Sequence, residues 1–294
     1  MRWISAGLAM IVVAGLAMVF LVRSGLMPAL PMPPIPARTE PTRAAETVVP
    51  TAPIALVVEE EDDPNVPLKV VPAIAEAPKA DSKNLHKPLL PDRSLLLETA
   101  TVDGKPKPVR LLLETEVCMR RGPLEVLLCR KNTKEHEAVI RTAVDAKLIH
   151  AALIALGAKP GSPVQFVDPK TDKEEYKPAS GESIDATVHY RHAGKLNAHK
   201  AQEWIRDLKT KKPMAYDWVF AGSRFLKDPE QPDKPPYYTA NNGEIVGISN
   251  FIDSMLDIPV NVSQDNAALA FEANTVRIPP VLTKVWLILE IRKP

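Results

Sequence analysis

The residues whose types could do chemistry gather in one stretch, LEVLLCRKNTKEHEAVI, at positions 124–140. Cys129 ends an apolar run, and Lys134, His136 and Glu137 follow it within eight residues. A cysteine among cations can be held as a nucleophilic thiolate, and a histidine beside a carboxylate can transfer protons. These four residues are therefore the candidate binding residues of the chain.

We assign none of the four a catalytic role, because no wider motif supports one. A nucleophilic cysteine needs a base within hydrogen-bond reach, and no protease-type or Ser-x-Gly signature accompanies Cys129. The same residues are equally typical of a buried, inert thiol followed by a solvated, charged turn. An enzyme or redox protein that uses Cys129 and His136 is the alternative.

The chain offers no recognisable metal or cofactor motif. Cys129, His136 and His150 are zinc-ligand types, but their spacings of seven and fourteen residues match no compact zinc motif. An iron–sulfur cluster normally takes four thiolates, whereas this chain has only Cys118 and Cys129. We therefore expect no metal and no cofactor.

Composition indicates an ordinary globular protein with an unusual share of proline. Lys and Arg number 37 against 36 Asp and Glu, so the formal charge is +1. That balance gives no electrostatic basis for binding nucleic acid. The chain has 30 prolines, about twice the usual share, and they are concentrated before residue 92.

The N-terminus predicts a transmembrane anchor, residues 1–23. Residues 3–22 hold no charge and no proline, and twenty helical residues span about 30 Å, the thickness of the hydrocarbon core. A cleaved signal peptide is the alternative, but no small-x-small cleavage site follows. We expect an uncleaved signal-anchor that makes a single pass through the cell membrane, with the C-terminal domain extracytoplasmic, in the periplasm.

Residues 24–91 are expected to form a disordered, proline-rich linker. From Arg23 to Pro91 there are fourteen prolines, and the acidic run from Glu59 to Asp63 repels itself. Proline favours extended polyproline II conformations, so this linker would be stiffened and would hold a folded domain away from a bilayer.

Residues 92–294 are expected to form one globular domain. Apolar and polar residues alternate over 184–191, which is the period of a half-buried strand. The stretch VDAKLIHAALIALG predicts one main helix, about 145–157, with Asp145 as the N-cap and Gly157 after the last turn. The fold class we expect is α+β, a mostly antiparallel sheet domain with this one main helix.

Two glycine-containing turns, Arg121-Gly122-Pro123 and Ala193-Gly194-Lys195, predict hairpins. The first would set Cys118 opposite Glu125, so Cys129 would lie about 13 Å further along the strand. A disulfide needs Cα atoms within about 7 Å. We therefore predict two unbridged thiols, with Cys129 largely buried.

Several stretches, in this order, resemble the bacterial YdjY-like proteins: GPLEVLLCRKNTKEHEAVI, LIHAALIALGAKPGSPVQF, DWVFAGSRF, GISNFIDSMLDIPV and FEANTVRIPP. The resemblance covers most of residues 95–294. It implies an envelope-associated domain whose biochemical role is unassigned. An iron–sulfur description attached to some members does not transfer to a chain with two cysteines.

Together these features predict a membrane-tethered envelope domain that binds a ligand or partner without catalysis. Its expected partners are the membrane, through residues 3–22, and a protein or small molecule of the cell envelope. Nucleic acid is not expected. A purely structural assembly subunit is a further alternative, which a large apolar patch on one face would favour.

Overall fold

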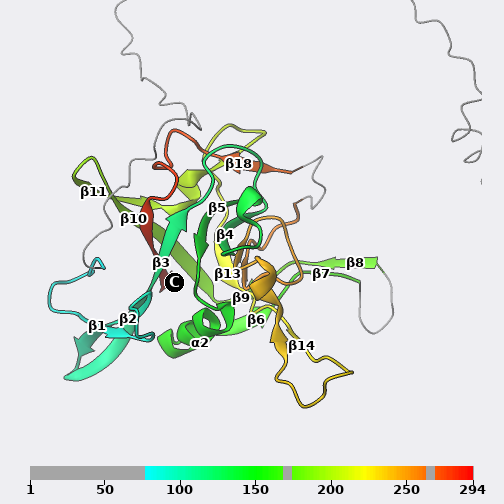
Figure 1. Ribbon diagram of the computed structural model, residues 1–294, viewed down its shortest axis with the longest axis horizontal. Coiled ribbons are helices and arrows are strands. Elements are labelled where there is room, and N and C mark those ends of the chain that lie inside the picture. The colour runs from blue at the N-terminus through cyan, green and yellow to red at the C-terminus, as the bar shows by residue number, and fades with distance from the viewer. Residues whose placement is uncertain (1–76, 168–173, 263–268, 294) are drawn as a thin grey trace, which may run out of the picture. The chain divides into compact units, whose positions relative to one another are not determined.

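The computed structural model describes residues 77–167, 174–262 and 269–293 (Figure 1). The predicted membrane span, residues 3–22, and most of the predicted linker lie outside this part of the chain. Within the described residues, the structure has no helix long and apolar enough to cross a bilayer.

The centre of the fold is a ring of eight hydrogen-bonded strands that closes on itself as a barrel. In order around the ring these are β3 (Lys105–Val117), β19 (Lys284–Ile291), β10 (Ser183–His192), β13 (Trp218–Phe220), β17 (Leu256–Asp257), β16 (Val246–Gly247), β4 (Val126–Arg130) and β5 (Ala138–Thr142). Closure pairs every barrel strand on both sides, which removes free sheet edges.

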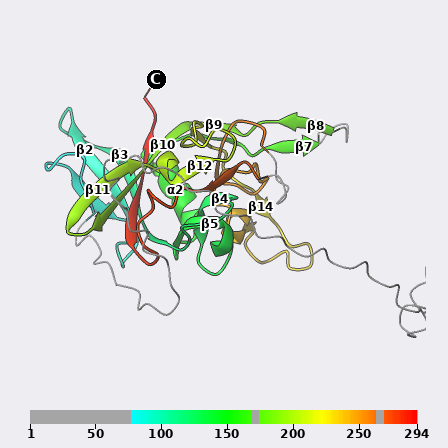
Figure 2. The ribbon, with the colours of Figure 1, turned by 90° about the horizontal axis from the view of Figure 1, so that it is seen from above.

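Further elements decorate the barrel (Figures 1 and 2). β2 (Leu95–Val102) and β1 (Leu85–Pro88) extend the sheet beyond β3, and β11 (Lys195–Lys200) pairs with β10. Four two-stranded pairs lie outside the barrel: β6 (Pro160–Ser162) with β9 (Ser180–Gly181), β7 (Gln165–Val167) with β8 (Glu174–Lys177), β12 (Ile205–Asp207) with β18 (Phe271–Ala273), and β14 (Phe225–Leu226) with β15 (Tyr237–Tyr238). Short 3-10 turns are η1 (Glu135–Glu137), η2 (Ala201–Trp204) and η3 (Thr239–Asn242).

The expected fold class, α+β with one main helix, is wrong, because the described residues are mostly β structure built around the barrel. The helix itself lies where the sequence predicts it. α2 runs Ala146–Leu156, the Asp145 side chain accepts from the backbone N–H of Lys147, and Gly157 ends it with φ of 104°. It is the one α-helix of the described residues, and it packs against β2 and β3. Five of the eight barrel strands have five residues or fewer, too short to show a period in the sequence.

One of the two expected hairpins forms and the other does not. β10 and β11 pair across Ala193 and Gly194, whose φ values of 49° and 77° suit a tight two-residue turn. The hairpin expected at Arg121-Gly122-Pro123 is wrong, because β5 lies between β3 and β4. β5 pairs antiparallel with β3 and parallel with β4. The predicted separation of about 13 Å between the two cysteines therefore loses its basis.

β1 lies within residues 24–91, the range of the predicted linker, and it is hydrogen-bonded along its length to β2. Glu98 of β2 has no solvent exposure and ties down the chain just before β1. Its Oε1 accepts from the backbone N–H of Ala80 at 2.9 Å and from Asn84 Nδ2 at 2.5 Å, while Arg110 donates to its Oε2. The ordered sheet thus includes residues before position 92.

The core fills the barrel and continues under α2. Leu111 and Leu113 of β3 belong to the same buried cluster as Ile149 and Leu153 of α2. On β10 the predicted alternation is confirmed, since every second side chain from Ile184 to Tyr190 is buried. A helix with one apolar face can cover such a core without a second layer of helices.

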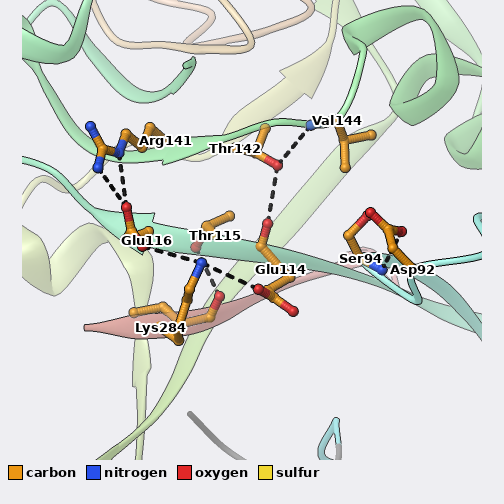
Figure 3. A network of polar contacts seen from close by, with 10 residues as sticks. Asp92, Ser94, Glu114, Thr115, Glu116, Arg141, Thr142, Val144 and Lys284 are labelled. Atoms are coloured by element: carbon orange, nitrogen blue, oxygen red, sulfur yellow. Dashed lines mark hydrogen bonds and ion pairs between the residues drawn. The ribbon is translucent and has the colours of Figure 1, made fainter. Parts of the chain in front are cut away.

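The barrel closes where β3 meets β5, which we call the seam. The ladder here has only two residue pairs, Glu116 with Arg141 and Val117 with Ile140. Side chains reinforce it (Figure 3): Arg141 Nη2 donates to Glu116 Oε1 at 2.6 Å, and Lys284 Nζ lies 3.1 Å from Glu116 Oε2. Thr142 Oγ1 also donates to the carbonyl of Glu114, at 3.0 Å. Side-chain contacts therefore add to the short backbone ladder of the seam.

Candidate functional site

Cys129 lies on β4 beside the seam and has no solvent exposure. Its thiol packs with Val126, Ala138 and the partly buried Cys118. A hydrogen bond with the Cys118 thiol, together with burial, raises the pKa of Cys129 far above its usual value. Since the thiolate is the reactive form, this cysteine is held in its unreactive state in the reduced protein.

Lys134 is the centre of a charged cluster formed with Glu125, Glu137 and Glu244, which we call the Lys134 cluster. Its Nζ lies 2.6 Å from Glu125 Oε2, 3.3 Å from Glu244 Oε1 and 3.9 Å from Glu137 Oε2. The ammonium also lies 4.1 Å from the centroid of the Phe251 ring. The Lys134 ammonium is thus shared by three carboxylates of the protein itself.

The pKa values in the Lys134 cluster reflect these contacts. Burial alone would lower the pKa of Lys134, but the hydrogen bond to Glu125 and the charge of Glu244 raise it above its usual value. Burial raises the pKa of Glu244, and burial with the neighbouring Glu125 carboxyl raises that of Glu137. Lys134 therefore stays protonated, and Glu137 and Glu244 lose their protons less readily than exposed glutamates do.

The structure brings three of the four predicted residues together and leaves one apart. His136 is largely exposed, and its Nε2 lies 3.5 Å from Glu137 Oε1, next to Lys134. Cys129 sits in a separate apolar cluster, and the groups that shift its pKa most are Cys118 and Thr133. Among the described residues, no group of three His, Cys, Asp or Glu side chains could hold a metal ion.

A groove that the sequence did not reveal runs between the start of α2 and the β14–β15 hairpin. It has a volume of about 450 Å³. Pro235, Pro236, Tyr237 and Tyr238 line it from the hairpin side, and Asp145 lines it from the helix N-terminus. These residues come from separate parts of the chain, so no sequence motif announces them.

The groove lining holds more cationic than anionic side chains. Arg130, Lys147 and Lys234 line it, and their side chains form no ion pair or hydrogen bond with other described residues. Its two carboxylates, Asp145 and Asp228, offset part of this charge, and each accepts hydrogen bonds from neutral donors. Asp145 Oδ1 accepts from the N–H of Lys147 at 2.8 Å and from Asn241 Nδ2 at 3.0 Å, and Asp228 accepts from Gln231 Nε2 at 2.7 Å. Three free cations therefore face solvent there.

The β14–β15 hairpin beside the groove exposes apolar side chains. Phe225 and Leu226 are each 51% exposed, and Tyr237 is 47% exposed. Figure 1 shows the loop that joins these strands projecting from the barrel. Large apolar side chains gathered on one projecting element are typical of a contact surface.

A histidine and a tyrosine join α2 to the hairpin at the wall of the groove. Tyr238 OH donates to the carbonyl of Gly222 at 2.9 Å, and His150 Nδ1 lies 2.7 Å from the same hydroxyl. A phenol has one proton, so His150 must donate from Nδ1 and keep a lone pair on Nε2. Burial lowers the pKa of His150, which favours this neutral form. The sequence offered His150 only as a residue of a zinc-ligand type.

Comparison with known proteins identifies the family. A family model described as the YdjY domain matches residues 100–290, which include both cysteines, the Lys134 cluster, α2 and the groove. No curated protein and no solved structure matches the chain. Since the family model covers well over half of the chain, the protein belongs to the YdjY domain family.

Proposed function

We propose that this protein is a non-catalytic binding module of the cell envelope, which holds an acidic, extended segment of a partner protein in the groove between α2 and the β14–β15 hairpin. The observation that carries the proposal is the set of three unpaired cations around an apolar trough. Unpaired Arg130, Lys147 and Lys234 attract carboxylates, and the neighbouring tyrosine rings offer apolar contact area.

The contacts favour a peptide over a small anion. The prolines and tyrosines of the groove form an apolar wall, which bare phosphate or sulfate would not use. Exposed Leu226 also lines the groove, and exposed Phe225 next to it extends the apolar surface of the hairpin. An extended chain that alternates acidic and apolar side chains could use the cations and the apolar wall together.

The alternative, an enzyme that depends on Cys129 and His136, gains no support from their surroundings. Cys129 is buried with a raised pKa, and His136 is an exposed partner of Glu137. Neither side chain lines the groove.

A site-specific photo-crosslinker tests the binding proposal in living cells. Placed at Leu226, which lines the groove, it should capture a protein through an acidic segment. Placed at Val276, which is 78% exposed, it should capture nothing in common with that product. Charge reversal at Lys147 and Lys234 should abolish the Leu226 product. Equal capture from both positions, or capture unchanged by charge reversal, would refute groove binding.

We also propose that residues 3–22 tether the domain to the cell membrane, with the domain on the extracytoplasmic side. The support is the charge-free run of twenty residues in the sequence. After cell fractionation and an alkaline wash, the full chain should stay with the membranes, and a chain lacking residues 1–23 should not. A mature N-terminus found anywhere in 24–40 would show cleavage and contradict the anchor.

A further inference from the structure

We propose that Cys118 and Cys129 form a thiol–disulfide exchange site, at which a disulfide oxidant converts them to an intramolecular disulfide that locks the seam of the barrel. The inference does not depend on the groove or on the proposed partner. It rests on the position of the two thiols relative to β5.

The backbone holds Cys118 against β5. It directly follows the last residue of β3, its backbone N–H donates to the carbonyl of Val139 at 2.9 Å, and its thiol donates to the carbonyl of Ala138 at 3.1 Å. Cys129 approaches from β4 on the other side of β5, where it pairs with Arg141. The two strands that carry the thiols are thus gathered around one short strand.

The two sulfurs meet in one small cluster. Cys129, Val126 and Ala138 are fully buried together, and Cys118 packs on them. The Cys118 and Cys129 thiols share a hydrogen bond, yet both cysteines are free in this structure. Because β5 lies between β3 and β4, closing the bond must draw the end of β3 and β4 together until the two Cα atoms lie within about 7 Å.

Exposure sets the order of events. Cys118 is partly exposed and Cys129 is buried, so an incoming disulfide reaches Cys118 first. The Cys118 thiolate attacks one sulfur of the oxidant, which forms a mixed disulfide and releases one thiolate. Cys129 then loses its proton and attacks the Cys118 sulfur, and the second thiolate leaves. Two protein thiols are oxidised, one oxidant disulfide is reduced to two thiols, and the leaving thiolates take up the two protons.

The second step is expected to be the slow one. The hydrogen bond with Cys118 and burial both raise the pKa of Cys129. Formation of the mixed disulfide removes the hydrogen bond with the Cys118 thiol but leaves the burial. Conversion should therefore be gradual, with Cys118 modified before Cys129.

The bond would reinforce the seam at which the barrel closes. The seam has a ladder of only two residue pairs, and the new crosslink would join the end of β3 to β4 across β5. It would close the loop of residues 119–128. A crosslink over so short a loop should raise the Tm by about 5 °C in a domain of this size.

The test is to incubate the reduced, purified full chain with oxidised glutathione, quench with acid, alkylate without reductant and analyse the peptides by mass spectrometry. We expect both alkyl adducts to disappear together, a 118–129 crosslinked peptide to appear, and dithiothreitol to restore both adducts. The oxidised chain should run as a monomer on a non-reducing gel and melt about 5 °C higher than the reduced chain.

Two variants make the result decisive. Cys129→Ser should stop at a glutathione adduct on Cys118, and Cys118→Ser should leave Cys129 unmodified in the folded chain. Neither variant should gain Tm on oxidation. The proposal is overturned if the native chain also stops at the Cys118 adduct, if it forms crosslinked dimers instead, or if neither thiol reacts.

Discussion

The Lys134 cluster and the groove differ in whether their cationic side chains form ion pairs within the protein. In the cluster, Lys134 contacts three carboxylates and has no capacity left for a ligand. In the groove, Arg130, Lys147 and Lys234 have no partner among the described residues, and Asp145 is engaged in capping α2. The cluster joins Lys134 and Glu137, which are close in sequence, to Glu244 from a distant segment. The unpaired charge lies where distant segments meet.

This contrast suggests that a dense run of chemical residue types is weak evidence for a site. Such residues face each other easily across a single turn, as Lys134 and Glu137 do in η1. Free binding capacity needs groups that the local chain cannot neutralise.

The largest expected effect follows from removing the central cation of the cluster. Lys134→Met would leave Glu125, Glu137 and Glu244 facing each other without compensation, so the variant should lose about 4 kcal/mol of unfolding free energy. Lys147→Met, which removes an unpaired groove lysine, is the matched control and should change stability by less than about 0.5 kcal/mol. Urea unfolding at pH 7.5 measures both. Similar small losses of stability for the two variants would show that the ion pairs of Lys134 contribute no more to stability than an unpaired lysine does.

Asp257 of β17 sharpens the comparison, because it is a buried carboxyl with one unpaired oxygen. Oδ1 accepts from the N–H of Ile258 at 2.8 Å, whereas Oδ2 has no hydrogen-bond partner. Burial raises its pKa to about 7. The folded protein therefore binds this proton more tightly than the unfolded chain does, and the stability it contributes is present below about pH 4 and is lost as the pH rises to 7.

Asp257→Asn should remove that pH dependence. As the pH rises from 4 to 8, the unfolding free energy of the native chain should fall, and that of the variant should fall by about 3 kcal/mol less. Urea unfolding at several pH values measures the difference. Parallel curves for the native and variant chains would show that Asp257 ionises normally in the fold.

Groove binding should depend on charge that is local to the groove. The probe is a fluorescein-labelled peptide of alternating glutamate and proline, followed by fluorescence anisotropy. Lys147→Glu with Lys234→Glu should weaken its binding about tenfold, and added salt should weaken binding to the native chain. Lys195→Glu with Lys209→Glu makes the same change in net charge on exposed lysines away from the groove, and it should have little effect. Equal losses for both pairs would indicate nonspecific attraction.

Local features of this fold could be predicted from the sequence, and the barrel could not. The α2 boundaries followed from Asp145 and Gly157, which act within a few residues of the helix ends. The β10–β11 turn likewise depends on Ala193 and Gly194 alone. Barrel closure instead pairs β3 with β5 while β4 lies between them in the sequence, and no local pattern specifies that order.

The candidate site divides in the same way. Proximity of Lys134, His136 and Glu137 could be expected from their spacing, but the two other carboxylates of the cluster come from the turn before β4 and from the segment between η3 and β16. The packing of Cys118 against Cys129 depends on β5 lying between β3 and β4, where the sequence predicts a simple hairpin.

The smallest effect concerns the pair formed by His150 and Tyr238, which are 88 residues apart in the chain. Tyr238→Phe removes the hydroxyl that accepts from His150 Nδ1 and donates to Gly222, so the variant should lose about 1 kcal/mol. Tyr237→Phe, whose hydroxyl donates to Asn242 at the surface, is the control and should lose less than half of that. Nitrogen NMR of the His150 ring provides the sharper measurement, because the native chain should carry its proton on Nδ1 alone, whereas Tyr238→Phe should show a mixture of tautomers. An Nε2-protonated ring in the native chain would reverse the assigned hydrogen bond between His150 and Tyr238.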